Sequence, residues 1–426
     1  MRFAGGHRIT ILQNGADFFP TLIDSIDRAQ TSVSLETYIF NDDRTGRAVA
    51  EALVRAAARG VAVRLVVDGF GTAALEGSVA EVVGSSLVDV RVFRPFRTVI
   101  GMRLRVLRRL HRKLCVIDGS EAFAGGINIL DDRVDPRHGA LEAPRLDFAL
   151  RVTGPLVAEV DEAMRRLWDE ASEQSSWAPG LRAARPLPDA AGVSQAVAGL
   201  TQRLPGPTQA LAGPTQGACS AWAARPADTP SSFDAVHAGL ALRDNVRNRR
   251  TIERLYLRAL GRARREVLIA SAYFLPGRRV RRALCAAARR GVRVRLLLQG
   301  RVEYRLPHLG TLALYEPLLR EGVEIIEYGP SFLHAKLAIA DDWVTVGSAN
   351  IDPFSLLLAR EANVFARSRP LAQALRMRLE QEIERGGRSV ELDRVTREPL
   401  WRRLAARAAW LMMRIGVAIS GSGLRY

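Results

Sequence analysis

Ala57-Ala58-Arg59-Gly60-Val61-Ala62-Val63-Arg64-Leu65-Val66-Val67-Asp68-Gly69 is a stretch that the chain repeats in its second half as Ala288-Arg289-Arg290-Gly291-Val292-Arg293-Val294-Arg295-Leu296-Leu297-Leu298-Gln299-Gly300. The alanine- and arginine-rich residues before Gly60 and Gly291 predict helices that end at a glycine. The β-branched and aliphatic residues after each glycine predict buried strands. The same helix, glycine and strand unit therefore occurs twice, which predicts an α/β fold with two related halves.

The likeness between the halves extends beyond this unit and divides the chain. Residues 32–40 resemble residues 267–274 in apolar pattern and aromatic end, and residues 88–93 parallel residues 323–328. Residues 178–232 are crowded with Pro, Gly, Ala, Ser, Thr and Gln and show no sustained helical or strand period. We predict a first domain at 1–177, a linker at 178–232, a second domain at 233–392 and a basic amphipathic tail at 393–426.

The composition is that of a globular protein with a surplus of positive charge. A hydrophobic fraction of 48% among 426 residues is sufficient for two cores. The three cysteines form no paired CxxC, which argues against a disulfide framework and a zinc site and indicates a reducing compartment. The 62 Lys and Arg residues against 45 Asp and Glu residues give a formal charge of +17, which favours phosphate-rich partners such as anionic lipid or nucleic acid.

Each half also carries the motif HxKxxxxD, once at residues 111–118 and once at residues 334–341. Residues two apart in an extended strand share a face, so each histidine is expected to project together with the lysine of its motif. These pairs are His111 with Lys113 and His334 with Lys336. The aspartate that closes each motif stands at an expected strand end, which suits a carboxylate that orients its neighbours better than one that attacks a substrate. These aspartates are Asp118 and Asp341.

A turn of small residues that ends in an asparagine follows each motif. The two turns are Gly125-Gly126-Ile127-Asn128 and Gly347-Ser348-Ala349-Asn350. Small residues allow an oxyanion to approach closely, histidine can be a nucleophile or a proton carrier, and lysine and the asparagine amide can hold phosphoryl oxygens. The second turn lies one residue nearer its motif, so Asn350 is expected to sit slightly differently from Asn128. Together these groups predict phosphoryl transfer without a metal or another cofactor.

The paired motifs resemble those of the phospholipase D superfamily, and the surrounding chain is similar to bacterial cardiolipin synthases, most of all to the B type. The most specific matches are residues 102–128, 243–300 and 334–363. The resemblance implies two pseudo-symmetric phospholipase D-like α/β/α sandwich domains with the active site at their interface. It also implies that one histidine forms a covalent phosphohistidine while the other protonates the leaving oxygen and then deprotonates the acceptor. We assign these roles to His111 and His334 respectively, and the near symmetry of the halves leaves the reverse order open.

The resemblance further implies a carboxylate after each motif that holds the second ring nitrogen of the histidine and fixes its tautomer. The matching positions are Asp147 and Glu361, for which an ordinary surface carboxylate is the competing interpretation. The expected catalytic set is His111, Lys113, Asp118, His334, Lys336 and Asp341. The residues expected to bind the substrate phosphate are Gly126, Asn128, Ser348 and Asn350.

The function expected from this resemblance is transfer of a phosphatidyl group from one phosphatidylglycerol to another with release of glycerol. A phospholipase D or a headgroup-exchange enzyme remains an alternative, and a nuclease of the same superfamily is a third. The positive charge would suit a nuclease, but no basic platform interleaved with aromatic residues accompanies it. We therefore expect phosphatidylglycerol and other anionic phospholipids as partners, with no nucleic acid, and leave the oligomeric state open.

Two segments interleave arginines with large apolar residues. Residues 102–110 suit lipid headgroups with acyl chains nearby, with buried core as the alternative. In the tail, Arg403, Arg407 and Arg414 fall within about 40° of one another at 100° per residue, which is typical of an interfacial helix, and a helix docked on the second lobe is the alternative. The sequence shows neither a secretory signal nor a long apolar span, so we expect a peripheral protein on the cytoplasmic side of the inner cell membrane.

Overall fold

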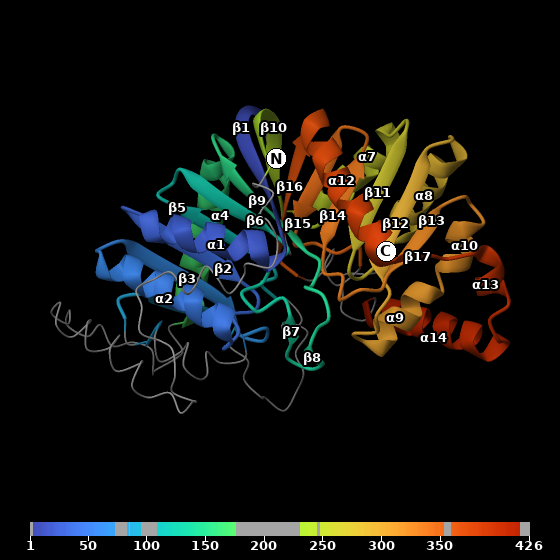
Figure 1. Ribbon diagram of the computed structural model, residues 1–426, viewed down its shortest axis with the longest axis horizontal. Coiled ribbons are helices and arrows are strands. Elements are labelled where there is room, and N and C mark those ends of the chain that lie inside the picture. Colours follow the sequence, from blue (N-terminus) through green and yellow to red (C-terminus); the bar gives the residue numbers. More distant parts are fainter. Residues whose placement is uncertain are drawn as a thin grey trace.

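The computed structural model describes residues 3–72, 83–84, 86–94, 109–175, 231–244, 248–352 and 359–417. Two lobes of similar build lie side by side, and one sheet runs through both (Figure 1). The strands of the first lobe are β1 (Ala4–Gln13), β2 (Ser32–Thr37), β3 (Ala62–Asp68), β4 (Asp89–Phe93), β5 (Leu114–Ile117), β6 (Glu121–Gly125) and β9 (Phe148–Thr153). Those of the second are β10 (Ser232–Arg243), β11 (Glu266–Ser271), β12 (Arg293–Gln299), β13 (Glu324–Tyr328), β14 (Lys336–Ala340), β15 (Trp343–Gly347), β16 (Glu361–Arg367) and β17 (Gly387–Ser389).

The strand order repeats on either side of the antiparallel pair β1 and β10 at the centre of the sheet. Outward from β1 the order is β9, β6, β5, β2, β3 and β4, and outward from β10 it is β16, β15, β14, β11, β12, β13 and β17. A separate hairpin of β7 (Val134–Asp135) and β8 (Gly139–Ala140) stands apart from this sheet. The two halves are therefore built on one plan, as the sequence repeat predicts.

Helices cover both faces of the sheet. The helices are α1 (Asn14–Arg28), α2 (Arg44–Ala58), α4 (Leu156–Ser175), α7 (Thr251–Arg262), α8 (Arg278–Arg289), α9 (Arg305–Leu312), α10 (Tyr315–Leu319), α12 (Arg369–Gly386), α13 (Leu392–Thr396) and α14 (Leu400–Val417). Alternate residues of β5 enter different cores: Leu114 and Val116 pack with α4, whereas Cys115 and Ile117 pack with α1 and α2. In the second lobe α12 shares the core that contains α4, and α7, α8 and α10 form another. This layering confirms the predicted α/β/α sandwiches.

The quoted repeat forms α2 with β3 in the first lobe and α8 with β12 in the second. Gly60 and Gly291 follow these helices with φ angles of +88° and +84°, a left-handed conformation that glycine adopts without strain. In each lobe this turn reverses the direction of the chain, so that the buried strand that follows packs against the helix before it. The sequence prediction for this unit is confirmed in both lobes.

Several sequence predictions concern residues outside the described part. Residues 102–108, most of the expected linker at 178–232 and the end of the tail at 418–426 belong to this group. At the border of the expected linker, Ser232 is already the first residue of β10. Leu110, at the end of the arginine-rich segment, is fully buried, so the core interpretation holds for that residue. Within the described residues, none of the helices combines the length and apolar content needed to cross a bilayer.

Candidate active site at the lobe interface

The two motif histidines lie where the lobes meet, each just before a central strand. The His111 amide donates to the carbonyl of Arg360 at 3.0 Å, and the His334 amide donates to the carbonyl of Leu146 at 2.8 Å. Isolated parallel bridges accompany both contacts. Each histidine is therefore fixed by its backbone to a segment of the opposite lobe.

The carboxylate beside each histidine also comes from the opposite lobe. His111 Nδ1 lies 3.1 Å from Glu361 Oε2, at the start of β16, and His334 Nδ1 lies 2.6 Å from Asp147 Oδ2, just before β9. Both carboxylates are buried, so the interpretation of them as surface residues is wrong. A carboxylate on Nδ1 orients the ring and leaves Nε2 for chemistry. The sequence named these residues but did not indicate that each motif is completed by the other half of the chain.

Burial favours the neutral form of both imidazoles. It lowers the pKa of His111, against the opposing effect of Glu361. It holds the pKa of His334 well below its usual range, and the charges of Lys336 and Lys113 act in the same direction. The charge of His111 also contributes to this lowering, so the two imidazoles influence one another across the interface. A neutral imidazole is the form that attacks phosphorus.

Two buried lysines accompany the histidines. Lys113 Nζ donates to the carbonyl of His111 at 2.8 Å, and Lys336 Nζ donates to the carbonyl of His334. Burial lowers the pKa of Lys113 to about 7 and that of Lys336 to about 8, although the neighbouring carboxylates raise both. Burial also raises the pKa of Asp147 to about 6, against the effect of Lys336. An anionic phosphodiester between the lysines would favour their charged forms.

The small-residue turns support the carboxylates in two different ways. A Cβ at Gly126 would lie 2.3 Å from Asp147 Oδ1, so only glycine leaves room for this carboxylate. At the equivalent position of the second lobe, the hydroxyl of Ser348 donates to Glu361 Oε2 at 2.5 Å. Both residues were expected to bind the substrate phosphate. The structure instead places them against the histidine-holding carboxylates, and we assign them this supporting role.

The asparagines occupy equivalent places in the two lobes. Leu114 pairs with Ala124 and Leu337 pairs with Val346, so the extra residue of the first lobe falls within the hairpin turn. The difference of one residue is therefore taken up in the hairpin turn, before the small-residue turn begins. The shift expected for Asn350 relative to Asn128 does not occur. Both side chains are buried. Asn128 Oδ1 accepts from the amide of Ile39 at 3.3 Å, and its Nδ2 has no hydrogen-bond partner among the described residues, so this amide can donate to a phosphoryl oxygen.

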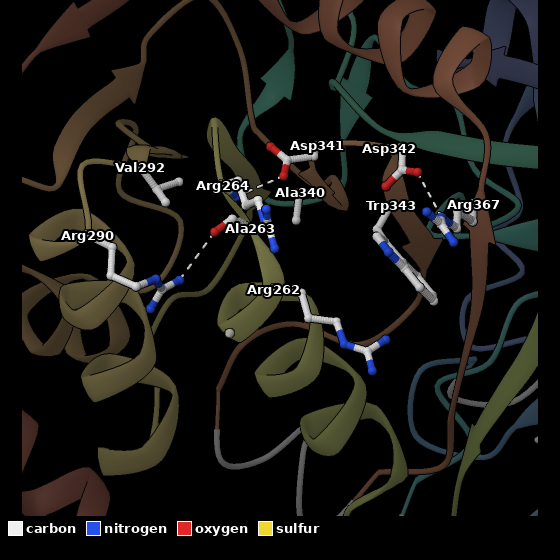
Figure 2. A pocket seen from close by; sticks show the side chains of 11 residues that line it. Arg262, Ala263, Arg264, Arg290, Val292, Ala340, Asp341, Asp342, Trp343 and Arg367 are labelled. Atoms are coloured by element: carbon white, nitrogen blue, oxygen red, sulfur yellow. Dashed lines mark hydrogen bonds and ion pairs between the residues drawn. The ribbon is translucent and has the colours of Figure 1, made fainter.

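The aspartates that close the motifs lie at the far ends of β5 and β14 from the histidines. Asp118 accepts from the backbone amides of Gln30, Thr31 and Ser32 at 2.8–2.9 Å. Asp341 accepts in the same way from three successive amides at 2.8–3.1 Å. It lines a hollow of about 690 Å³ among several arginines (Figure 2). These contacts fix strand ends, and we propose a structural role for both aspartates, which agrees with the orienting part that their position in the motif predicts.

Two residues of the quoted repeat were missed as parts of the site. Asp68 Oδ2 accepts from the amide of Leu110 at 2.8 Å, and Gln299 Oε1 accepts from the amide of Leu333 at 2.8 Å. The two acceptors occupy aligned positions of the repeat, and the amides they bind belong to the residues directly before the motif histidines. The signal in the sequence was a polar residue that follows three successive apolar residues at the end of the strand in both copies.

A buried ion pair distinguishes the first lobe. Arg112, between the histidine and lysine of its motif, forms two hydrogen bonds of 3.0 Å with Glu36 on β2. Burial raises the pKa of Glu36 to about 7, against the opposing charge of Arg112. The second motif has Ala335 at the corresponding position. This pair fastens the strand behind His111 without entering the reactive cluster.

The described residues contain no group of three or more His, Cys, Asp and Glu side chains arranged to hold a metal ion. The interface offers two imidazoles whose Nδ1 atoms are held by carboxylates, two buried ammonium groups and two amides. This set can attack a phosphodiester, protonate its leaving oxygen and balance the charge of its phosphoryl oxygens.

Comparisons with known proteins identify the family of this chain. A family model described as "Cardiolipin synthase, PLD-like domain" matches residues 22–168 and 256–383. The chain is 34% identical over 399 residues to cardiolipin synthase B of Salmonella typhi, covering 93% of this chain and 85% of that protein. It is 30% identical to cardiolipin synthase A of Pseudomonas putida, covering 89% and 69%. The fold is also that of a phosphatidylserine synthase from Haemophilus influenzae, with a TM-score of 0.64 and 14% identity over 97% of this chain and 95% of that one. The chain belongs to the cardiolipin synthase family of phospholipase D-like phosphatidyltransferases.

Proposed function

We propose that this chain is a cardiolipin synthase that transfers a phosphatidyl group from one phosphatidylglycerol to the hydroxyl of a second. The products are cardiolipin and glycerol. The observation that carries this proposal is the crossed arrangement of His111 with Glu361 and His334 with Asp147. It places a nucleophilic histidine and a proton-carrying histidine at one interface, each oriented by a carboxylate from the opposite lobe.

In the first step, His111 Nε2 attacks phosphorus, a P–N bond forms and the P–O bond to glycerol breaks. His334, protonated at Nε2, gives its proton to the departing oxygen. Asp147 stabilises the cationic form that His334 needs for this step, although burial disfavours that form. Lys113, Lys336 and the two motif asparagines hold the phosphoryl oxygens.

In the second step, neutral His334 takes the proton from the hydroxyl of the second phosphatidylglycerol. The resulting oxygen attacks phosphorus, and the P–N bond to His111 breaks. The overall reaction breaks one phosphodiester bond and forms another, so it needs no energy from a nucleotide. No metal enters this scheme. Water in place of the second lipid would give hydrolysis to phosphatidate, so the supply of lipid hydroxyl decides between synthase and phospholipase outcomes.

The proposed setting is the cytoplasmic side of the inner cell membrane, where the chain would bind peripherally. The formal charge of +17 supports an anionic lipid surface as partner. Phosphatidylglycerol serves as both donor and acceptor in this scheme, and nucleic acid has no place in it.

The test uses purified protein and vesicles that contain radiolabelled phosphatidylglycerol. We expect cardiolipin and glycerol in equal amounts, and a labelled protein that loses its label in acid, as a phosphohistidine does. Production of phosphatidate alone would assign phospholipase activity instead. Cleavage of DNA with no lipid product would contradict the proposal and favour a nuclease.

A further inference from the structure

The C-terminal helix α14 is docked on the second lobe by one narrow face. Ala406, Ala409 and Met413 are buried at this contact, and α14 packs mainly against α9. Gly310 of α9 allows the close approach, since a Cβ there would lie 3.3 Å from the sulfur of Met413. Arg403 Nη2 adds an ion pair of 2.8 Å with Glu316 of α10. The docked-helix interpretation is therefore correct for this face.

The opposite face of α14 is apolar and uncovered. Its large apolar side chains have between 49% and 73% of their surface exposed: Leu400, Trp401, Leu404, Leu411, Met412 and Ile415. At 100° per residue these six positions fall within an arc of about 120°. A helix that merely completes a soluble lobe directs polar residues outward, so this arc calls for an apolar environment.

Basic residues follow one edge of the apolar arc. Arg403, Arg407 and Arg414 lie within about 40° of one another beside Leu400 and Leu411. Arg403 is already paired with Glu316, so the exposed Arg407 is the member of this edge placed to reach phosphate groups while its apolar neighbours enter the acyl layer. A second copy of this chain would instead bring an identical arginine edge to the same contact, where like charges oppose one another.

A second set of exposed apolar residues lies just before and at the start of α9, the helix against which α14 packs. Val302, Tyr304 and Leu306 are between 40% and 47% exposed. Between them lies Glu303, whose charge acts on the catalytic Lys336 and whose carboxylate accepts from Tyr273 at 2.7 Å. Figure 1 shows α9, α14 and the β7–β8 hairpin along the same side of the molecule. A surface bound to this side would lie next to the loop that reaches the site.

We propose that α14 binds in the interface of an anionic phospholipid bilayer and orients the lobe interface toward the lipid headgroups. The docked face keeps the helix on the enzyme, the uncovered face enters the membrane, and the arginine edge selects negatively charged lipid. This inference extends the proposed function, because it names the surface by which the enzyme would reach its lipid substrate.

The test compares two double variants of the full chain. Leu404→Glu/Leu411→Glu places charge in the apolar arc, and the matched control Met377→Glu/Leu87→Glu makes the same change at exposed apolar residues outside it. Binding is measured by co-sedimentation with vesicles of phosphatidylcholine containing 30% phosphatidylglycerol. We expect at least a tenfold loss of binding for the α14 variant and less than a twofold change for the control.

Two further measurements separate docking from catalysis and folding. Turnover of a short-chain phosphatidylglycerol dissolved as monomers should be unchanged in the α14 variant, since docking is not needed for a soluble substrate. If the wild-type protein does not turn over this substrate, the proposed function is contradicted, whereas the vesicle co-sedimentation result still stands. Leu400→Glu is a second variant that tests the same arc, at a helix start where a carboxylate is favourable.

The docking inference is wrong if the α14 variants bind vesicles as the control does. It is also wrong if sedimentation equilibrium finds a wild-type dimer that Leu404→Glu/Leu411→Glu converts to monomer. In that case a second copy covers the helix.

Discussion

The two halves of the active site share a plan and differ in how each carboxylate is supported. Asp147 lies against Gly126, where the absence of a side chain makes room, and Glu361 accepts a hydrogen bond from Ser348. The shorter aspartate needs close approach to reach His334, at 2.6 Å, whereas the longer glutamate reaches His111 at 3.1 Å and uses a hydroxyl for support. The difference teaches that the repeat preserves the position of the carboxylate oxygen while the residues that achieve it have changed.

The same comparison distinguishes the residues that would take part in the reaction from those that only hold the strands in place. The first lobe fastens its motif strand with the buried Arg112–Glu36 pair, and the second has an alanine in the place of the arginine. Both lobes nevertheless present histidine and lysine in the same way. The predictions that follow change one half at a time, so that each result reports which features are equivalent.

The largest effect is expected for the histidines themselves. His111→Ala and His334→Ala should each reduce cardiolipin formation by at least about 10³-fold, since each removes an irreplaceable step. A phosphatidyl ester of p-nitrophenol separates them, because its leaving group departs without a proton. His334→Ala should still release one equivalent of p-nitrophenol per site, and His111→Ala should release none. A burst from His111→Ala alone would reverse the two roles.

The crossed carboxylates give the next largest effect. Asp147→Asn and Glu361→Gln should each lower turnover by about 10- to 100-fold, because the imidazole loses the charge that orients it and supports its cation. With the p-nitrophenyl ester, Asp147→Asn should keep a rapid first release of p-nitrophenol, as the His334 variant does, whereas Glu361→Gln should slow this first release. The opposite pattern would mean that each carboxylate serves the histidine of its own lobe.

Sequence alone was sufficient for the repeat and the α/β pattern, because these depend on the local order of residues. The sandwich layers, and the side chains expected to react, followed from the family resemblance that the paired motifs carry. It could not show the crossing, since Asp147 follows His111 in the chain and yet contacts His334. It also grouped Asp118 with the histidines because one motif contains both. The intervening strand separates them, and the aspartate accepts hydrogen bonds from the amides at the start of β2. Contacts between the two lobes depend on how the lobes pack, so the residues of a single motif do not predict them.

A smaller effect is expected at the positions that support the carboxylates. Gly126→Ala should displace Asp147 and reduce turnover by about tenfold, since the added Cβ would overlap Oδ1. Ser348→Ala removes the hydrogen bond that the hydroxyl donates to Glu361 and the one that it accepts from the Ala362 amide. Loss of the bond to Glu361, about 1 kcal/mol, should lower turnover roughly fivefold. Steady-state kinetics on phosphatidylglycerol vesicles would measure both. Gly84→Ala is the matched control, because a Cβ there meets nothing within 4 Å, and a loss as large as that of Gly126→Ala would refute the steric argument.

The smallest effect on activity is expected at Asp118, whose substitution should change stability instead. Burial alone would raise the pKa of this carboxyl, but hydrogen bonds from Ser32, Gln30 and Thr31 lower it to about 2. Its pKa in the unfolded chain is about 3.9. The folded pKa is therefore depressed, so the stabilisation is present above about pH 4 and disappears as the pH falls toward 2.

Asp118→Asn should accordingly lower the free energy of unfolding by about 1 kcal/mol at pH 7, with turnover per folded molecule unchanged. Urea titrations at pH 7 and pH 3 would show a gap between variant and wild type that narrows in acid. Asp24→Asn is a control at an exposed ion pair with Arg28, whose loss should scarcely alter stability at either pH. A large loss of turnover in folded Asp118→Asn would return this residue to the catalytic set, because a carboxylate that only fixes the end of β5 cannot control the chemistry at its start.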